Sequence, residues 1–229
     1  MKKTLSLVLT LFLTVGLASA QSSGSEAKIK ATGNNNDVTV EQVRGADNNA
    51  SIWVSGNQNV VSEYQRGDRN QVLLEVAGGS NDAIRSKQMG DDNAIYVNFR
   101  GARPAPVFQS NDVDKNDFLF LQVGKENIFG GAVAGDGNSG QFKQYGTGNT
   151  LLGDTDLDGD GVDRYDAQGL MIEGHRNTLR GLQQGRLNTG KIMATGNGNH
   201  LRFQQKGQQN YGEILVTGDG NTARVTQGQ

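Results

Sequence analysis

The densest group of side chains that could bind a ligand is a run of carboxylates in the stretch DTDLDGDGVDRYD. Carboxylates so close together repel one another unless a cation or water screens them, and Asp-x-Asp-x-Asp-Gly is the start of one kind of calcium-binding loop. Tyr165 stands where a glutamate would close that loop, and a solvated acidic loop without a ligand is the alternative. We predict a calcium site in the segment 154–166, on five aspartates: Asp154, Asp156, Asp158, Asp160 and Asp163.

Few other residues could catalyse a reaction. The chain has no cysteine, and its two histidines are His175, in the stretch GHRN, and His200, directly after an asparagine. Both fit turn positions better than the role of a general base. No serine lies in a Gly-x-Ser-x-Gly pattern, and GDGNSG at residues 135–140 repeats a turn found throughout the chain instead of forming a phosphate loop. We therefore predict that the chain is not an enzyme.

The first twenty residues are typical of a secretory signal peptide. Lys2 and Lys3 precede the apolar run of residues 5–17, and Ala-Ser-Ala follows at 18–20. Removing residues 1–20 leaves 229 − 20 = 209 residues with a formal charge of −2 − 2 = −4. Such mild acidity provides no surface for nucleic acid or anionic lipid, and no later stretch is apolar enough to span a membrane. We expect a secreted protein.

The composition is unsuited to an ordinary globular core. Apolar residues make up 34% of the chain, below the usual share of about 45–50%, and there are 33 glycines. Such a chain is either disordered or builds a thin, repetitive fold that needs few apolar residues per layer. Internal repetition decides between the two.

A Gly-x-x-Asn pattern recurs along the chain. Nine of its thirteen steps are 11 residues and two are 12, a regularity that disorder does not explain. In alternate copies the residue two before the glycine is Gln, with Gln42 one place further away, and in the other copies it is apolar, so the period is about 22 residues. The glycines are at positions 33, 45, 56, 67, 78, 90, 124, 135, 146, 174, 185, 196, 207 and 218.

Alternating apolar and polar residues connect these turns, a pattern that indicates strands with one buried face. Glycine allows the chain to reverse with positive φ, and Asn caps such turns. The sequence therefore predicts an all-β fold, a β-solenoid with two strands per turn and about eight units over residues 33–229, after a short segment 21–32. We expect amide ladders anchored by Gln65, Gly67, Asn70, Gln88, Gly90, Asn93, Gln122, Gly124, Asn127, Gln144, Gly146, Asn149, Gln183, Gly185, Asn188, Gln205, Gly207 and Asn210.

Two long steps interrupt the repeat. The excess in the first, at about 103–114, contains both prolines of the chain, which would cost hydrogen bonds inside a sheet. The second, at about 153–169, contains the aspartates of the predicted calcium site. Since one insertion follows an apolar-type half and the other a Gln-type half, we expect them to leave the solenoid at opposite edges.

Paired halves of the form Gln-x-Gly-x-x-Asn, each followed by an alternating strand, resemble the curlin repeat of curli amyloid subunits, from about residue 33 to 229. The resemblance implies a secreted subunit that assembles into cell-surface fibres for adhesion and biofilm. Its implied partners are other copies of itself, other curlin subunits and an outer-membrane secretion and assembly machinery, and it implies no cofactor beyond the predicted Ca²⁺. This chain has more units, more charge and two insertions compared with the familiar subunits, which favours a minor or nucleating role.

The sequence leaves a rival function open. A soluble, monomeric β-solenoid could bind polysaccharide, a surface or ice, but it would present regular ranks of one side chain, and the outward residues vary. Against a monomer, the C-terminal stretch NTARVTQGQ ends inside a repeat, and little precedes the first turn. Uncapped strand ends are templates for another copy.

Some exposed features have two interpretations. Four large side chains at outward strand positions, namely Trp53, Tyr64, Leu73 and Tyr96, are either scattered surface residues or a face for lateral packing or adhesion. The tripeptide at 66–68, Arg-Gly-Asp, is either an adhesive motif or variable residues around a turn glycine, and we favour the second. Charged turn residues such as Arg66 and Lys125 are suited to slowing premature assembly.

Overall fold

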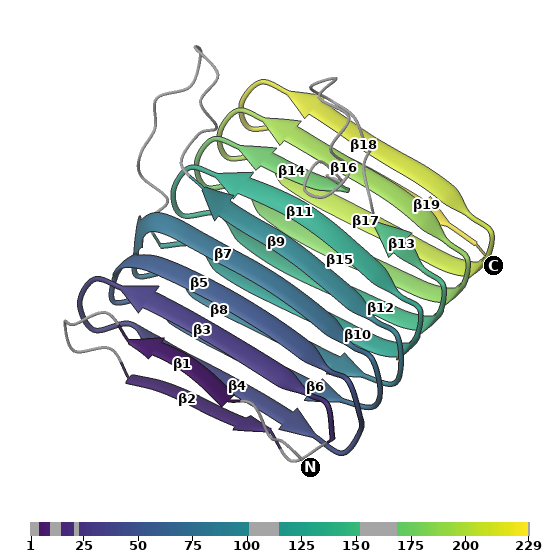
Figure 1. The fold of residues 1–229 in the computed structure, drawn as a ribbon. Coiled ribbons are helices and arrows are strands. Elements are labelled where there is room, and N and C mark those ends of the chain that lie inside the picture. The colour runs from purple at the N-terminus through teal and green to yellow at the C-terminus, as the bar shows by residue number, and fades with distance from the viewer. Residues whose placement is uncertain (1–4, 10–14, 21–22, 101–114, 152–168, 229) are drawn as a thin grey trace, which may run out of the picture.

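The computed structural model describes residues 5–9, 15–20, 23–100, 115–151 and 169–228, and every regular element in these ranges is a β-strand. Figure 1 shows two sheets lying face to face, with the chain winding from one to the other and advancing along the stack. The predicted all-β solenoid is therefore confirmed. We name the two sheets A and B. A strand of sheet A, together with the strand of sheet B that follows it in the chain, is called a rung.

Sheet A has ten strands and sheet B has nine. Sheet A consists of β1 (Leu5–Leu9), β3 (Glu26–Thr32), β5 (Asn49–Asn57), β7 (Gln71–Ser80), β9 (Ala94–Arg100), β11 (Ile128–Ala134), β13 (Thr150–Leu151), β14 (Leu170–Glu173), β16 (Thr189–Thr195) and β18 (Tyr211–Thr217). Sheet B consists of β2 (Val15–Ala20), β4 (Asp37–Val43), β6 (Val60–Arg66), β8 (Ala83–Met89), β10 (Asp117–Lys125), β12 (Ser139–Thr147), β15 (Thr178–Arg186), β17 (His200–Gln208) and β19 (Thr222–Gln227).

All described pairings are parallel and place equivalent positions of the repeat beside one another. In sheet B, Gln122 pairs with Gln88 on one side and Gln144 on the other. Parallel strands in such a stack lie about 4.8 Å apart. Apart from one register shift between Val54 and Gly56, the strands keep their register, so equivalent positions of the repeat form continuous columns along the stack.

The turn glycines are required by close packing of successive rungs. Gly67 has a φ of 112°, and a Cβ at this position would lie 2.1 Å from the carbonyl oxygen of Gly90 in the next rung. The residue two after it, Arg69, is also left-handed, with a φ of 55°. The Gly-x-x-Asn turn therefore contains two positive-φ positions, of which the first admits only glycine.

One predicted turn is displaced by a residue. Gly56 pairs with Gly79, after a register shift that follows Val54, so the turn glycine is Gly79 and not the predicted Gly78. The place of the capping Asn is then taken by Asp82, which is buried. The local sequence offers two overlapping turns here, and pairing with the neighbouring rungs selects the second.

The flanks of the second insertion correct an expectation. Leu151 of β13 pairs with Gly190, and Leu170 of β14 pairs with Ile192, two places further along β16. Strands β13 and β14 therefore occupy the place of a single strand in sheet A. The second insertion interrupts that strand, instead of extending a turn at the edge opposite the first insertion as the spacing predicted. Residues 152–168 themselves lie outside the described residues, as do 101–114 of the first insertion.

The N-terminal region extends the stack. Strand β3, within the segment 21–32, pairs with β5, so the sheets begin before Gly33. Strands β1 and β2 of the predicted signal peptide pair with β3 and β4. Cleavage after residue 20 stays a prediction, and it would leave β3 and β4 as the first rung.

Candidate functional site

A column of glutamines follows the inner face of sheet B. The Nε2 of each one before Gln227 donates to the Oε1 of the glutamine in the next rung, over distances of 2.7–2.9 Å. Where the neighbours are Gln144 and Gln183, the bond spans 39 residues of sequence across the second insertion. The column comprises Gln42, Gln65, Gln88, Gln122, Gln144, Gln183, Gln205 and Gln227.

Each glutamine also ties the two sheets together. The Nε2 of Gln88 donates to the backbone oxygen of Gln71, at the start of a sheet A strand, at 3.0 Å. Gln144 makes the equivalent bond to Ile128, at 2.9 Å. Since Gln88 and Gln144 are 0% and 1% exposed, these bonds satisfy amides that water does not reach.

The asparagines that end the turns from sheet B to sheet A form a second ladder. The Nδ2 of Asn127 donates to the Oδ1 of Asn93 at 3.0 Å and to the backbone oxygen of the turn glycine Gly146 at 2.9 Å. Each asparagine thus holds a neighbour's amide and a neighbour's turn. The same side-chain bond links Asn48, Asn70, Asn93, Asn127, Asn149, Asn188 and Asn210 in sequence order.

The two ladders run in opposite directions. Glutamine amides donate towards the C-terminal rungs, as from Gln122 to Gln144, while asparagine amides donate towards the N-terminal rungs, as from Asn149 to Asn127. Each ladder aligns its amide dipoles along the stack, so the opposed directions partly cancel. The stack gains continuous hydrogen bonding along both columns.

The structure brings the eighteen predicted anchor residues together in these columns, and it adds residues that the sequence did not single out. The opposite edge has its own column, which includes Asp82 and Asn116 as well as the predicted capping asparagines. Asn116 follows the first insertion and donates through Nδ2 to Asp82 at 3.1 Å. Its turn has no glycine at the expected place, so the repeat pattern could not find it.

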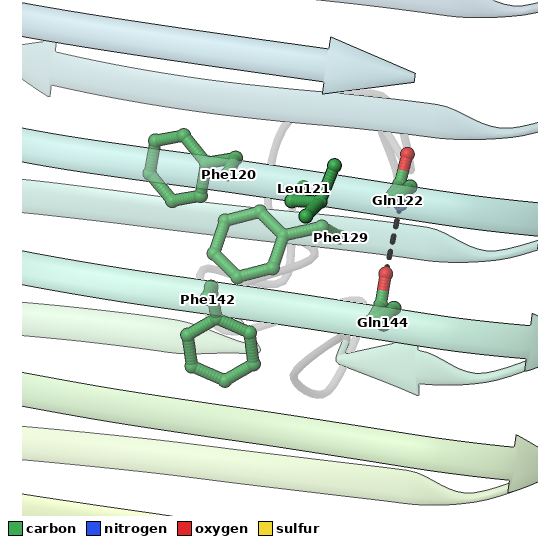
Figure 2. Close-up of a pocket in the computed structure, with 6 residues that line it drawn as sticks. All are labelled: Phe120, Leu121, Gln122, Phe129, Phe142 and Gln144. Carbon is green, nitrogen blue, oxygen red and sulfur yellow. Dashed lines mark hydrogen bonds between the residues drawn. The ribbon is translucent and has the colours of Figure 1, made fainter. Parts of the chain in front are cut away.

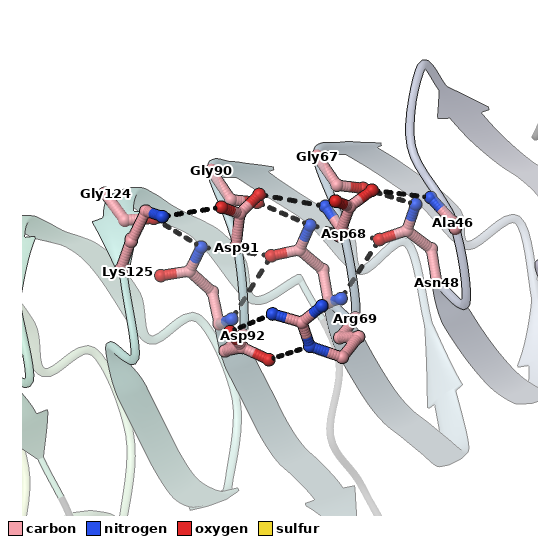
Figure 3. A network of polar contacts seen from close by, with 12 residues as sticks. Ala46, Asn48, Gly67, Asp68, Arg69, Gly90, Asp91, Asp92, Gly124 and Lys125 are labelled. Atoms are coloured by element: carbon pink, nitrogen blue, oxygen red, sulfur yellow. Dashed lines mark hydrogen bonds and ion pairs between the residues drawn. The ribbon is translucent and has the colours of Figure 1, made fainter.

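A further ladder uses the residue directly after the turn glycine. The Oδ1 of Asp68 accepts the backbone N–H of Ala46 at 2.7 Å, and the Oδ1 of Asp91 accepts that of Asp68 at 3.1 Å (Figure 3). On the other edge, the Nδ1 of His175 accepts the N–H of Asp136 at 3.0 Å. The aspartate of the Arg-Gly-Asp tripeptide therefore caps the preceding turn, which corrects its interpretation as a freely variable residue.

Ion pairs join these acidic turns to one another. Arg69 contacts both carboxylate oxygens of Asp92, at 2.6 and 2.7 Å, and Lys125 lies 2.9 Å from Asp91 (Figure 3). The N–H of Asp68, and then the ammonium of Lys125, lower the pKa of Asp91, and the guanidinium of Arg69 lowers the pKa of Asp92. The pairs are largely exposed, so they contribute little to stability.

Phenylalanines fill the core beside the glutamine ladder. Figure 2 shows Phe120, Phe129 and Phe142 between the sheets, next to the bond from Gln122 to Gln144. Their ring centroids are 4.6 and 4.9 Å apart along this series, and the rings are tilted, as aromatic pairs prefer. The six residues that line this space leave no room for a ligand, so this region is a packed core.

The predicted outward aromatic residues are spread over both sheets. Trp53 and Tyr96 lie on sheet A and are 48% and 36% exposed. Tyr64 lies on sheet B, where the Nζ of Lys87 is 4.8 Å from its ring centroid. In sheet A, Trp53 pairs with Lys30 and Glu75 in the adjacent strands, so its column does not repeat one residue type.

The predicted calcium ligands lie outside the described residues, and the calcium site stays a prediction. Elsewhere in the described chain, no group of three or more His, Cys, Asp or Glu side chains is placed to hold a metal ion. The described residues also contain no helix that could span a membrane.

Comparison with protein-family models and with curated proteins gave no match. Among solved structures, the crystal structure of the polySia specific acetyltransferase NeuO aligns over 93% of this chain and 83% of its own chain. The aligned residues are 11% identical and the TM-score is 0.20. Chains with so low a TM-score do not superpose as a whole, so nothing about this chain's function follows from the alignment.

Proposed function

We propose that this protein is a secreted structural subunit that polymerises end to end into curli-like amyloid fibres. The observation that carries the proposal is the uniform geometry of the ladders. The Gln-to-Gln distance stays within 2.7–2.9 Å from Gln42 to Gln227, including the steps across both insertions. The hydrogen bonds between two neighbouring rungs therefore do not depend on the length of chain that connects them. A rung of another copy could form the same bonds.

The residues at the two ends of the glutamine ladder are complementary. Gln42 Oε1 is buried and has no hydrogen-bond partner, and the residue paired with Gln42 in the preceding strand of sheet B, β2, is Ala20. Removal of the predicted signal peptide would uncover this acceptor. The Nε2 of Gln227, which turns to the backbone oxygen of Tyr211, would supply the donor from a second copy.

Strands β18 and β19 form an exposed rung within the described chain. Each pairs with one neighbour, β18 with β16 and β19 with β17. Their open sides present unpaired backbone groups, which favour addition of a further strand. Addition of another subunit at this rung would satisfy these groups and continue all the ladders.

The resemblance to curlin repeats supports the biological setting that we propose: export through the periplasm and an outer-membrane pore, assembly at the cell surface, and a role in adhesion and biofilm, with a minor or nucleating role as one form. In this proposal the chain acts by assembly and not by catalysis. The columns of mixed outward residues, such as Lys30, Trp53 and Glu75, argue against a regular face for ice or polysaccharide.

The test is to purify the chain from residue 21 onward, with the full chain in parallel, and to follow thioflavin fluorescence and electron microscopy. We expect fibres from the shorter chain. Gln227→Ala should slow their growth, while Thr222→Ala, an exposed change on the same strand, should not. A chain that stays monomeric for days at high concentration, with and without calcium, would contradict the proposal and favour the soluble binding module.

A further inference from the structure

Glu63 is a carboxylic acid placed in the core of the solenoid. It occupies an inward position of β6 and is 1% exposed. Neither of its carboxylate oxygens has a hydrogen-bond partner. In sheet B it lies between Val40 of β4 and Ser86 of β8, and the buried Ser86 hydroxyl also lacks a partner.

No charged group faces Glu63 from the strands packed around it. The inward residues of β4, β8, β5 and β7 are apolar side chains, serine or ladder glutamines, namely Val38, Val40, Gln42, Ile84, Ser86, Gln88, Ala50, Ile52, Val54, Val72, Leu74 and Val76. The other titratable residues of β4, β6, β8 and β7 all lie at outward, solvent-facing positions. These are Asp37, Glu41, Tyr64, Arg66, Arg85, Lys87 and Glu75.

The repeat does not require an acid at this position. In sheet B the same column continues from Ser86 to Phe120 and Phe142. Every other buried carboxylate or amide of the described core takes part in a ladder or has another partner at one or more atoms. Glu63 alone places a whole carboxyl group, with no partner, at a position that otherwise holds Ala, Val, Ser, Gly or Phe.

The protonation state of Glu63 decides whether this position is tolerated. An isolated charged carboxylate in an apolar interior is far more costly than its neutral acid. Burial raises the pKa of Glu63 well above its usual range. When the pKa of a carboxyl group is raised in the folded state, its contribution to the free energy of unfolding is fully present below the unfolded pKa, about 4.3. That contribution is lost as the pH rises through the folded pKa.

We propose that Glu63 makes formation of the rungs from β4 to β8 dependent on mild acid, so that the N-terminal part of the solenoid closes only when this carboxyl group is neutral. For folding, the inference stands on the position of Glu63 alone. Its extension to assembly rests on the proposed fibre function. On that function, fibres would form faster in an acidic surrounding than at neutral pH, and the chain would be kept from premature assembly during export.

The test compares the full chain with two variants. Glu63→Val introduces the residue type that Val40 has in the same column, and Glu63→Gln introduces a side chain that is neutral at every pH. Glu41→Gln, an exposed change on β4, is the matched control. β-structure is measured by circular dichroism after dilution from urea at steps between pH 5 and pH 8. The thioflavin lag is recorded for the same four proteins made from residue 21 onward, the form that is expected to assemble.

For the unchanged chain and Glu41→Gln, we expect the folding equilibrium constant of this region to fall about tenfold per pH unit between the unfolded and folded pKa values of Glu63. Glu63→Val and Glu63→Gln should lose this dependence. Asp91 and Asp92 have lowered pKa values, so their contribution is lost as the pH falls, and it remains in all four proteins. The difference between proteins therefore isolates Glu63.

Equal pH dependence of the unchanged chain and Glu63→Val would overturn the inference, as would the absence of β-structure at every pH in all four proteins. If no protein forms fibres but the pH dependence of β-structure still differs between the unchanged chain and Glu63→Val, the proposed function is contradicted. The effect of Glu63 on folding is then still supported. If fibres form with equal lags at pH 5 and pH 8 in the unchanged chain and in Glu63→Val alike, the extension to assembly is wrong.

Discussion

The rungs from β3 to β8 and those from β10 to β17 are bordered by the same amide ladders but are filled differently. The first region packs Val, Ile, Leu and Ala around Glu63 and Ser86, and its described core contains no aromatic side chain. The second region packs phenylalanines against glycines. A Cβ on Gly181 would lie 2.2 Å from the ring of Phe142, its partner in the sheet, and one on Gly140 would lie 2.4 Å from Phe118.

This difference separates two tasks within the repeat. The ladders set the register, because each amide must find one donor and one acceptor in the adjacent rungs. The core has only to fill the space between the sheets, which a large residue beside a small one does as well as two of middle size. The core is therefore free to vary, and the first region uses that freedom to hold a carboxyl group.

The largest difference between the regions should appear when a core side chain is removed. Phe142→Ala is expected to lower the free energy of unfolding by about 3–5 kcal/mol, because Gly140 and Gly181 beside it cannot fill the cavity. Val61→Ala in the first region should cost roughly 2 kcal/mol, since less apolar surface is lost. Urea denaturation followed by circular dichroism measures both, and equal losses would mean that the phenylalanine core relaxes around the cavity.

The ladders should show no such difference. Gln65→Ala in the first region and Gln144→Ala in the second should each cost about 1–3 kcal/mol, because each leaves buried amide groups of its neighbours without a partner. Gln141→Ala, an exposed change on β12, is the control and should stay within about 0.5 kcal/mol of the unchanged chain. If the two ladder variants differ by more than their combined error, register depends on the core as well.

The smallest effect is expected at Ser86, beside Glu63. Its buried hydroxyl has no partner, so Ser86→Ala removes a desolvated polar group and should leave stability within about 1 kcal/mol of the original or raise it. Thermal and urea unfolding at pH 5, on the acidic side where the neutral form of Glu63 is favoured, measure the change. A loss well beyond 1 kcal/mol would show that the hydroxyl has a partner in solution.

Much of the fold could be predicted because the pattern is local and repeated. Gln-x-Gly-x-x-Asn located the turns and the ladder residues, and the alternation between turns located the buried face. The pattern failed between Val76 and Asp82, where overlapping turns begin at Gly78 and Gly79. It also could not show where within the second long step the extra residues fall, because spacing gives only their number.

The residue after each turn glycine shows a different limit. Ala46, Asp68, Asp91 and His175 look like unrelated polar or small residues in the sequence. In the structure, Asp68, Asp91 and His175 do one job, accepting the backbone N–H of the preceding rung. Because an aspartate, an asparagine or a histidine nitrogen can do this, no single letter repeats and the ladder is hidden from pattern analysis.

The sequence by itself determined the period, the paired strands, the turn glycines and the columns of Gln and Asn, because each depends on residues within one unit of about 22. The tertiary structure alone decided the opposed directions of the two ladders, the fit of phenylalanine against glycine, and the isolation of Glu63. These depend on contacts between residues 22 to 39 places apart in the ladders. The stacking of one rung on the next decides such contacts, and local pattern does not record them.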